Sequence, residues 1–268
     1  MTYTSEEPGY TTEWVSSLAK KFGMSGQIRE SKEAYFADET EEDDYIFVVH
    51  RDDKIIVFEN YHGQSGDPPS PEDATKSVKE FLENTSLMFP DATEAGIDYN
   101  TGGSISSSGE YVQNFRQIVV IFSRELNGLE VWDSEILADV DSQGNVVGLF
   151  ISWRDYKPYK EVSLKTPEQA FEEFLKEFAR VHGEKTEIVI VTDVLLGYSS
   201  LPISGTQRYL QPTYVFEGSV QRGSSIDEFE PIIIVTGSTS LMHTLDSGMS
   251  SPISPNRFSS LPVSQMPV

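Results

Sequence analysis

The sequence changes three times from the spacing of an amphipathic helix to the residue types of β-strands, and this alternation limits the possible folds. The second and third helical segments open with nearly the same residues, Ser70-Pro-Glu-Asp-Ala74 and Thr166-Pro-Glu-Gln-Ala170. A hydroxyl residue followed by proline at the first helical position is typical of a helix start. The shared opening predicts a degenerate internal repeat.

Each helical segment carries apolar residues three and four positions apart, as expected of a helix that packs on one side. The three apolar faces are Trp14, Leu18 and Phe22; Ala74, Val78, Phe81 and Leu82; and Ala170, Phe174 and Phe178, broadened by Phe171 and Leu175. In the third segment, Gln169 is placed to complete a capping box with Thr166.

Stretches rich in β-branched and aromatic residues follow each helix and predict strands. They cover residues 27–36, 45–50 and 54–59, then 115–123, 131–140 and 146–153, and finally 187–196, 213–220 and 231–235. Pairs such as Asn127-Gly128 and Gly144-Asn145 favour the tight turns of hairpins, and hairpins build antiparallel sheets. We therefore expect an α+β fold of about three repeated helix-plus-antiparallel-sheet (α-β-β-β) units.

The repeat predicts the organisation of the chain. We expect the first unit over residues 10–63, the second over 68–162 and the third over 164–238. Residues 101–109 (Thr-Gly-Gly-Ser-Ile-Ser-Ser-Ser-Gly) are expected to form a flexible loop in the second unit. Residues 247–268 are rich in serine and proline, and we expect this tail to be disordered.

The chain contains 43 acidic and 20 basic residues, a formal net charge of −23. A surface of this charge repels phosphate backbones, so we expect no nucleic-acid partner. The simpler interpretation of the acidic excess is solubility, and an acidic binding patch is the alternative.

No apolar run approaches the ~20 residues of a membrane span. The first residues lack the basic and apolar regions of a signal peptide. The protein is then either cytoplasmic, or it is exported or anchored through an N-terminal segment that has been removed. Any association with a membrane would depend on that segment.

Metal and cofactor sites have little support in the sequence. The absence of cysteine removes disulfides, zinc thiolates and cysteine nucleophiles. The segment Asp139–Gly144 begins like a calcium loop, but its twelfth position is Phe150, and a hairpin turn explains it better. We expect no cofactor and no tightly bound metal.

One acidic run could bind a divalent cation weakly, although like charges in sequence usually mark a solvated loop. Its carboxylates are Asp38, Glu39, Glu41, Glu42, Asp43 and Asp44.

Catalytic motifs are also absent. Gly63-Gln-Ser65-Gly66 is not a nucleophile elbow, and no glycine-rich phosphate loop occurs. We expect a protein that is not an enzyme. The alternatives are a hydrolase or metal-dependent enzyme whose carboxylate site is not visible in sequence, and a structural protein of the cell envelope.

Five segments carry a resemblance to a known family. They are Phe122–Trp132, Ile136–Val140, Ser163–Ala170, Val194–Tyr198 and Tyr209–Gly218. In these segments the chain resembles the PepSY-like extracytoplasmic proteins, especially the YycH/YycI type of two-component regulatory proteins. The resemblance implies units of a helix and an antiparallel sheet outside the cytoplasmic membrane.

The resemblance further implies a regulatory module that binds a protein or peptide, with a membrane-associated partner as one alternative. It brings no catalytic residues and leaves the oligomeric state open. Independently, an antiparallel sheet with a helix on one face leaves its other face for a neighbour or partner. Aromatic side chains are frequent anchors of interfaces, although most in a sheet protein belong to the core. The candidates are Trp132, Trp153, Tyr198, Tyr209, Tyr214 and Phe216.

Overall fold

The structure is a computed structural model that describes residues 1–6, 9–25, 27–39, 45–51, 55–63, 66–105, 111–182, 188–200, 209–222 and 225–235. The chain divides into two compact units. The larger unit spans Ser5–Asp155, and the smaller unit combines Met1–Thr4 with the described residues from Tyr156 onward. The tail predicted over 247–268 lies outside the described residues.

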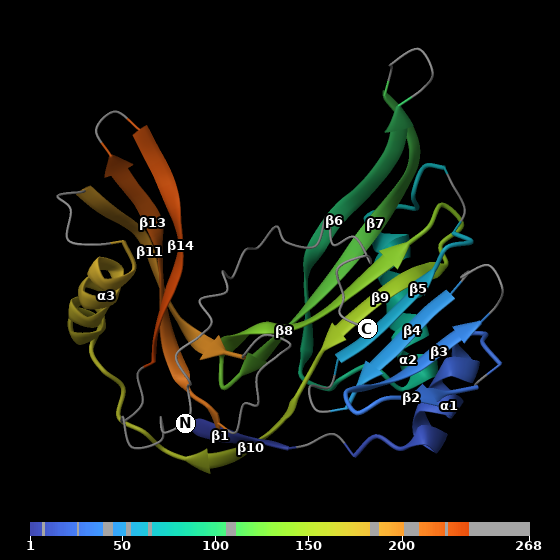
Figure 1. The fold of residues 1–268 in the computed structure, drawn as a ribbon, viewed down its shortest axis with the longest axis horizontal. Coiled ribbons are helices and arrows are strands. Elements are labelled where there is room, and N and C mark those ends of the chain that lie inside the picture. Colours follow the sequence, from blue (N-terminus) through green and yellow to red (C-terminus); the bar gives the residue numbers. More distant parts are fainter. Residues whose placement is uncertain are drawn as a thin grey trace. The chain divides into compact units, whose positions relative to one another are not determined.

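The larger unit consists of one antiparallel sheet and two helices (Figure 1). The helices are α1 (Thr12–Lys21) and α2 (Pro71–Thr85). The strands are β2 (Arg29–Glu30), β3 (Ala34–Glu39), β4 (Tyr45–His50), β5 (Ile55–Asn60), β6 (Ala92–Ile105), β7 (Tyr111–Leu126), β8 (Leu129–Val140) and β9 (Val146–Ser152). They are ordered β2-β3-β4-β5-β9-β8-β7-β6, and every neighbouring pair is antiparallel.

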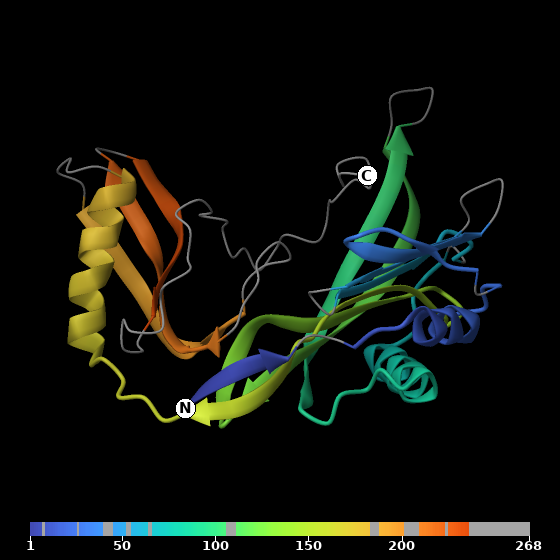
Figure 2. The ribbon, with the colours of Figure 1, turned by 60° about the horizontal axis from the view of Figure 1, so that its bottom comes forward.

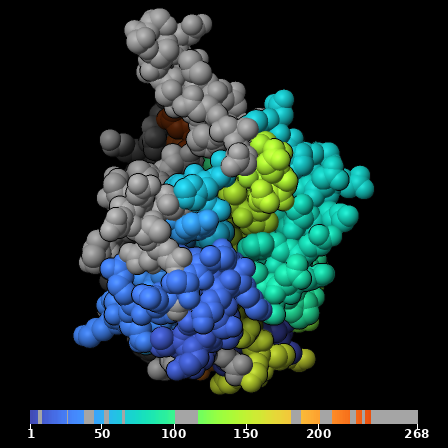
Figure 3. Space-filling view, turned by 90° about the vertical axis from the view of Figure 1, so that its right-hand side faces the viewer, coloured from blue at the N-terminus to red at the C-terminus, as the bar shows by residue number. Residues whose placement is uncertain are grey.

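Both helices of the larger unit cover the same face of its sheet (Figure 2). Val15 and Leu18 of α1 and Val78 and Leu82 of α2 are buried against this face. Seen from the side of the helices, the blue surface of α1 adjoins the turquoise surface of α2 (Figure 3). The Lys21 ammonium joins them by donating to the Thr85 carbonyl at 3.0 Å. One side of the sheet therefore provides the core.

The smaller unit contains two antiparallel arrangements of strands. Its strands are β1 (Thr2–Glu6), β10 (Asp155–Lys160), β11 (Ile188–Ser199), β12 (Tyr209–Leu210), β13 (Pro212–Arg222) and β14 (Ser225–Val235). β11, β13 and β14 pair in the order β14-β13-β11, and β10, β1 and β12 form a small second sheet. The helix α3 (Pro167–His182) lies on one face of β11-β13-β14 (Figure 2).

The core of the smaller unit forms where α3 meets this sheet. Ala170, Phe174 and Phe178 of α3 are buried there, and the ring of Phe174 stacks on that of Phe216 with centroids 4.7 Å apart. The predicted capping box is confirmed, because Gln169 donates its backbone N–H to the Thr166 hydroxyl at 3.3 Å and accepts from the Thr166 N–H at 3.0 Å.

The predicted fold class, α+β, is confirmed. Each helix is followed by antiparallel strands, and α1 and α2 with their strands contribute to one sheet. The loop expected over residues 101–109 is not a loop up to residue 105, because β6 continues through Ile105 by pairing its backbone with β7. The outermost strand of a sheet pairs on one side only, so a glycine- and serine-rich sequence is tolerated there. Residues 106–110 lie outside the described part of the chain.

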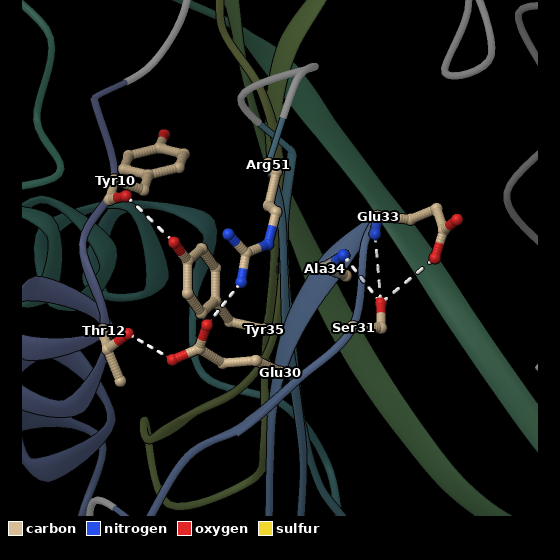
Figure 4. A network of polar contacts seen from close by, with 8 residues as sticks. All are labelled: Tyr10, Thr12, Glu30, Ser31, Glu33, Ala34, Tyr35 and Arg51. Atoms are coloured by element: carbon tan, nitrogen blue, oxygen red, sulfur yellow. Dashed lines mark hydrogen bonds and ion pairs between the residues drawn. The ribbon is translucent and has the colours of Figure 1, made fainter.

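A second difference concerns the strand predicted over residues 27–36. The structure divides it into β2 and β3 at a turn that Ser31 stabilises, because its hydroxyl accepts from the N–H groups of Glu33 at 3.1 Å and Ala34 at 3.0 Å (Figure 4). Such side-chain bonds to the local backbone compete with strand pairing. β-branched composition alone could not reveal this turn.

A polar network fastens the segment before α1 to this edge of the sheet (Figure 4). Tyr35 donates its hydroxyl to the Tyr10 carbonyl at 3.0 Å, and the Arg51 guanidinium lies 4.0 Å from the centre of the Tyr35 ring. Arg51 also pairs with Glu30 at 2.6 Å, and Glu30 accepts from the Thr12 hydroxyl. The network therefore connects the start of α1 with β2, with β3 and with the residue that follows β4.

Candidate functional site

The predicted cation site falls partly outside the described residues. Asp38 and Glu39 are the last residues of β3, while residues 41–44 are not described. Among the residues that the structure describes, no group of three or more potential ligands could hold a metal ion. The same part of the chain contains no helix that is long and apolar enough to cross a membrane.

The segment that begins like a calcium loop is a hairpin turn. The buried Asp141 carboxylate accepts from the backbone N–H groups of Gln143 and Asn145, each at 2.9 Å. Gly144 has a φ of +82°, which explains the glycine at this position. The carboxylate is therefore used by the turn that joins β8 to β9.

Four of the six candidate aromatics belong to the core: Trp153, Tyr198, Tyr214 and Phe216 are buried. The ring of Trp153 stacks on that of Phe89 at 4.8 Å. The hydroxyl of Tyr198 donates to the Met1 carbonyl at 3.1 Å, and burial raises the pKa of Tyr198 to about 12. Only partly exposed residues are available to a partner without rearrangement.

Trp132 and Tyr209 are the two candidates that are partly exposed. The ring of Tyr209 lies 5.2 Å from that of Tyr159, and the Tyr159 side chain is 52% exposed. For these two residues, a role at an interface stays a prediction.

The sheet of the larger unit has a second face, opposite to α1 and α2. Side chains alternate between the two faces of a strand, so the neighbours of the core residues point to this second face. A continuous row of six partly exposed apolar side chains crosses it, one from each of the strands β3, β4, β5, β9, β8 and β7. The members of this apolar row are Phe36, Val48, Val57, Phe150, Leu137 and Ile121. Phe150 also takes part in a further interaction.

Carboxylates lie on both sides of the apolar row. The next row along the strands, here the acidic row, contains Glu59, Asp139 and Asp98, with Gly148 and Val119 between them and Ile46 beside Glu59. The row on the other side contains Glu135 together with Ile55, Ser152, Ser123 and Thr93. None of these positions is a lysine or an arginine.

Asp139 lies at the centre of the acidic row. Burial raises the pKa of Asp139 to about 6, a hydrogen bond with Asn100 opposes the rise, and the charge of Glu59 adds to it. A side chain at Gly148 would overlap the Asp139 carboxylate, and its Cβ would lie only 3.0 Å from that of Asp139. The glycine therefore makes room for the carboxylate against the neighbouring strand.

Glu135 is the carboxylate on the opposite side of the apolar row. Burial raises the pKa of Glu135 to about 7, and the charge of Asp133 contributes to this rise. Asp133 has a φ of +61° and accepts through its carbonyl from the Ser152 hydroxyl at 2.9 Å. Burial also raises the pKa of Asp133. Both flanks of the row thus hold carboxyl groups whose charged form is poorly solvated.

The sequence could indicate part of this surface. The alternation of residues 131–140 places Glu135, Leu137 and Asp139 on one face of a strand. It could not show that β9 lies between β8 and β5, and therefore that Leu137 and Val57 belong to one row. The surface could therefore not be predicted from the sequence.

No protein-family model and no curated protein matches this sequence. Among solved structures, the fold is similar to that of an uncharacterized protein from Eubacterium rectale ATCC 33656, with 10% sequence identity and a TM-score of 0.53. That alignment covers 87% of this chain and 81% of the other. At this identity the similarity extends to the fold alone and defines the class of protein, an α+β protein built on antiparallel sheets.

A second similar structure is the Bacillus megaterium YpeB C-terminal domain. The sequence identity is 11%, the alignment covers 85% of this chain and 94% of the other, and the TM-score is 0.39.

Proposed function

We propose that the chain is a non-catalytic module that binds a segment of another protein or a peptide on the face of the larger unit opposite to α1 and α2. The continuous apolar row across six strands carries this proposal. The core side of the same sheet is covered by two helices, whereas no described helix covers the row. Contiguous apolar surface rimmed by polar residues is typical of an interaction site.

The size of the row suits one polypeptide segment. Neighbouring strands are about 4.8 Å apart, so the five steps from β3 to β7 span about 24 Å. Burying apolar surface contributes about 25 cal/mol for each Å² removed from water. The partly exposed side chains of the apolar row therefore support a modest, reversible affinity rather than a permanent complex.

The apolar character of the surface favours binding over catalysis. Val48, Val57, Leu137 and Ile121 offer no nucleophile, base or ligand. The raised pKa values of Glu135 and Asp139 are the feature that would favour the alternative, an enzyme with a carboxylate site. These two carboxyls flank the apolar row on opposite sides, so a segment lying on the row would contact both.

We further propose an extracytoplasmic, regulatory setting. The support for it is the resemblance of residues 115–218 to PepSY-like extracytoplasmic proteins, including the YycH/YycI type. Fractionation of the source cells, with an antibody against this chain, tests the setting. Recovery outside the cytoplasmic fraction is expected, and recovery only with cytoplasmic proteins would contradict it.

Selection of peptides from a random displayed library tests the proposed binding. We expect peptides that bind the wild-type chain and bind Leu137→Ser at least tenfold more weakly. Ile226→Ser is the matched control, because Ile226 is an apolar residue of the smaller unit that is 64% exposed. Circular dichroism and thermal melting establish that both variants are folded.

Peptides that bind both variants as tightly as the wild type would overturn the assignment of this face. A library that yields no binder would do the same.

A further inference from the structure

We propose that the segment bound on this face is a basic amphipathic helix, whose apolar stripe lies on the apolar row and whose lysine or arginine side chains reach the carboxylates on both sides. The inference rests on the proposed function and specifies its partner. It follows from the spacing of the apolar row and from the charge of its two flanks.

The spacing of the apolar row matches the spacing of the turns of an α-helix. Residues of the apolar row follow one another at about 4.8 Å, the distance between strands. The turns of an α-helix follow one another at about 5.4 Å, so side chains at i, i+4 and i+7 meet successive members of the row. The row of about 24 Å corresponds to about 16 helical residues. A helix crossing the strands can therefore contact Val48, Val57, Leu137 and Ile121 with one stripe.

The carboxylates lie on both flanks of the apolar row. Along a strand, side chains of one face recur about every 6.8 Å, which places carboxylates about that far from the apolar row on either side. Glu59, Asp139 and Asp98 lie on one flank and Glu135 on the other. Basic residues that border the apolar stripe of a helix with a diameter of about 10 Å can reach both flanks.

Lysine and arginine do not balance these carboxylates within the three rows. The apolar row and its two neighbouring rows contain no lysine or arginine. Glu59 and Asp139 repel each other, as do Asp133 and Glu135. A cation placed between such carboxylates replaces repulsion with attraction and favours their charged form. Acidic side chains beside the apolar stripe of a partner would instead be repelled by these carboxylates.

Three synthetic peptides of about 16 residues test the inference. One carries a leucine stripe bordered by lysines, the second replaces every lysine by glutamate, and the third has the lysine–leucine composition in a scrambled order that breaks the stripe. Affinity is measured by isothermal titration calorimetry at low and at physiological ionic strength. We expect the first peptide to bind at least tenfold more tightly than either of the others, and more weakly as salt is added.

Two pairs of variants separate the local charges from the overall charge of −23. The double variant Glu59→Gln/Asp139→Asn should weaken the lysine–leucine peptide at least tenfold. Glu80→Gln/Glu83→Gln removes the same charge from the exposed side of α2, on the opposite side of the sheet, and should change the affinity less than twofold. Thermal melting of each variant verifies that it is folded.

The outcomes distinguish this inference from the proposed function. If the glutamate peptide binds as tightly as the lysine peptide, and both depend on Leu137, the face binds polypeptides but the basic partner is wrong. Equal losses in both double variants would mean that net charge alone attracts the peptide, which overturns the inference. If no peptide depends on Leu137, the inference and the proposed function both fail.

Discussion

At the scale of single residues, the carboxyls of β8 are the least expected feature of the protein. The chain has 43 acidic residues, and such residues usually lie in water. Glu135 and Asp139 instead lie where burial raises the pKa of each. The sequence interpretation of the acidic excess as solubility does not account for these two. Burial of an ionisable group costs stability, and such groups often belong to functional surfaces.

The pKa of Glu135 makes the stability of the protein depend on pH. Its value of about 7 in the folded chain lies above its ordinary value of 4.5, so between these pH values the folded state holds more protons than the unfolded state. The contribution of Glu135 to the free energy of unfolding therefore falls as the pH rises through this window. Replacing Glu135 with Gln should remove this loss.

We expect Glu135→Gln to gain stability over the wild type between pH 4.5 and pH 8, by on the order of 1–3 kcal/mol. Urea denaturation at both pH values measures the difference. Glu130→Gln, an exposed carboxylate of the same strand, controls for the loss of one charge. A difference between Glu135→Gln and wild type that does not change with pH would mean that Glu135 is well solvated.

At the scale of elements, the helices could be predicted from local sequence patterns. Unexpected strands such as β6 could not. The spacing of Phe174 and Phe178 and the Thr166–Gln169 capping box were visible in sequence because they depend on residues within a few positions of each other. The strand β6 was not predicted at all, and its residues 101–105 were expected to form a loop because glycines and serines favour one, whereas pairing with β7 decides the conformation. Long-range backbone pairing overrides local preference in such strands.

The packing of α3 gives a direct test at this scale. Phe174 is fully buried against Phe216 and Phe229, whereas Leu175, its neighbour in sequence, is 44% exposed. We expect Phe174→Ala to lower the free energy of unfolding by about 3–5 kcal/mol. Leu175→Ala is the matched control and should cost less than about 1 kcal/mol. Similar losses in the two variants, measured by denaturant titration, would show that the helix presents a different face.

At the scale of the whole molecule, the fold class could be predicted from the sequence, whereas the proposed binding face could not. The repeated helix openings correctly indicated helices followed by antiparallel strands. The apolar row depends on the order of strands, because Val57 and Phe150 are neighbours through the pairing of β5 with β9. The register of strands so distant in sequence is set by tertiary packing, which no local pattern contains. The candidate aromatics illustrate the same limit: they could belong to an interface or to the core, and Trp153 and Phe216 are buried in the cores.

Methyl NMR can show whether the face opposite to α1 and α2 binds a polypeptide. The tightest peptide from the displayed library is added to protein labelled at its isoleucine, leucine and valine methyl groups. We expect the largest chemical-shift changes at the methyl groups of Val48, Val57, Leu137 and Ile121. Val15 and Leu18, which belong to α1 and are buried in the core, should change little. Changes confined to other surfaces, such as Ile188 and Ile226 of the smaller unit, would contradict the claim.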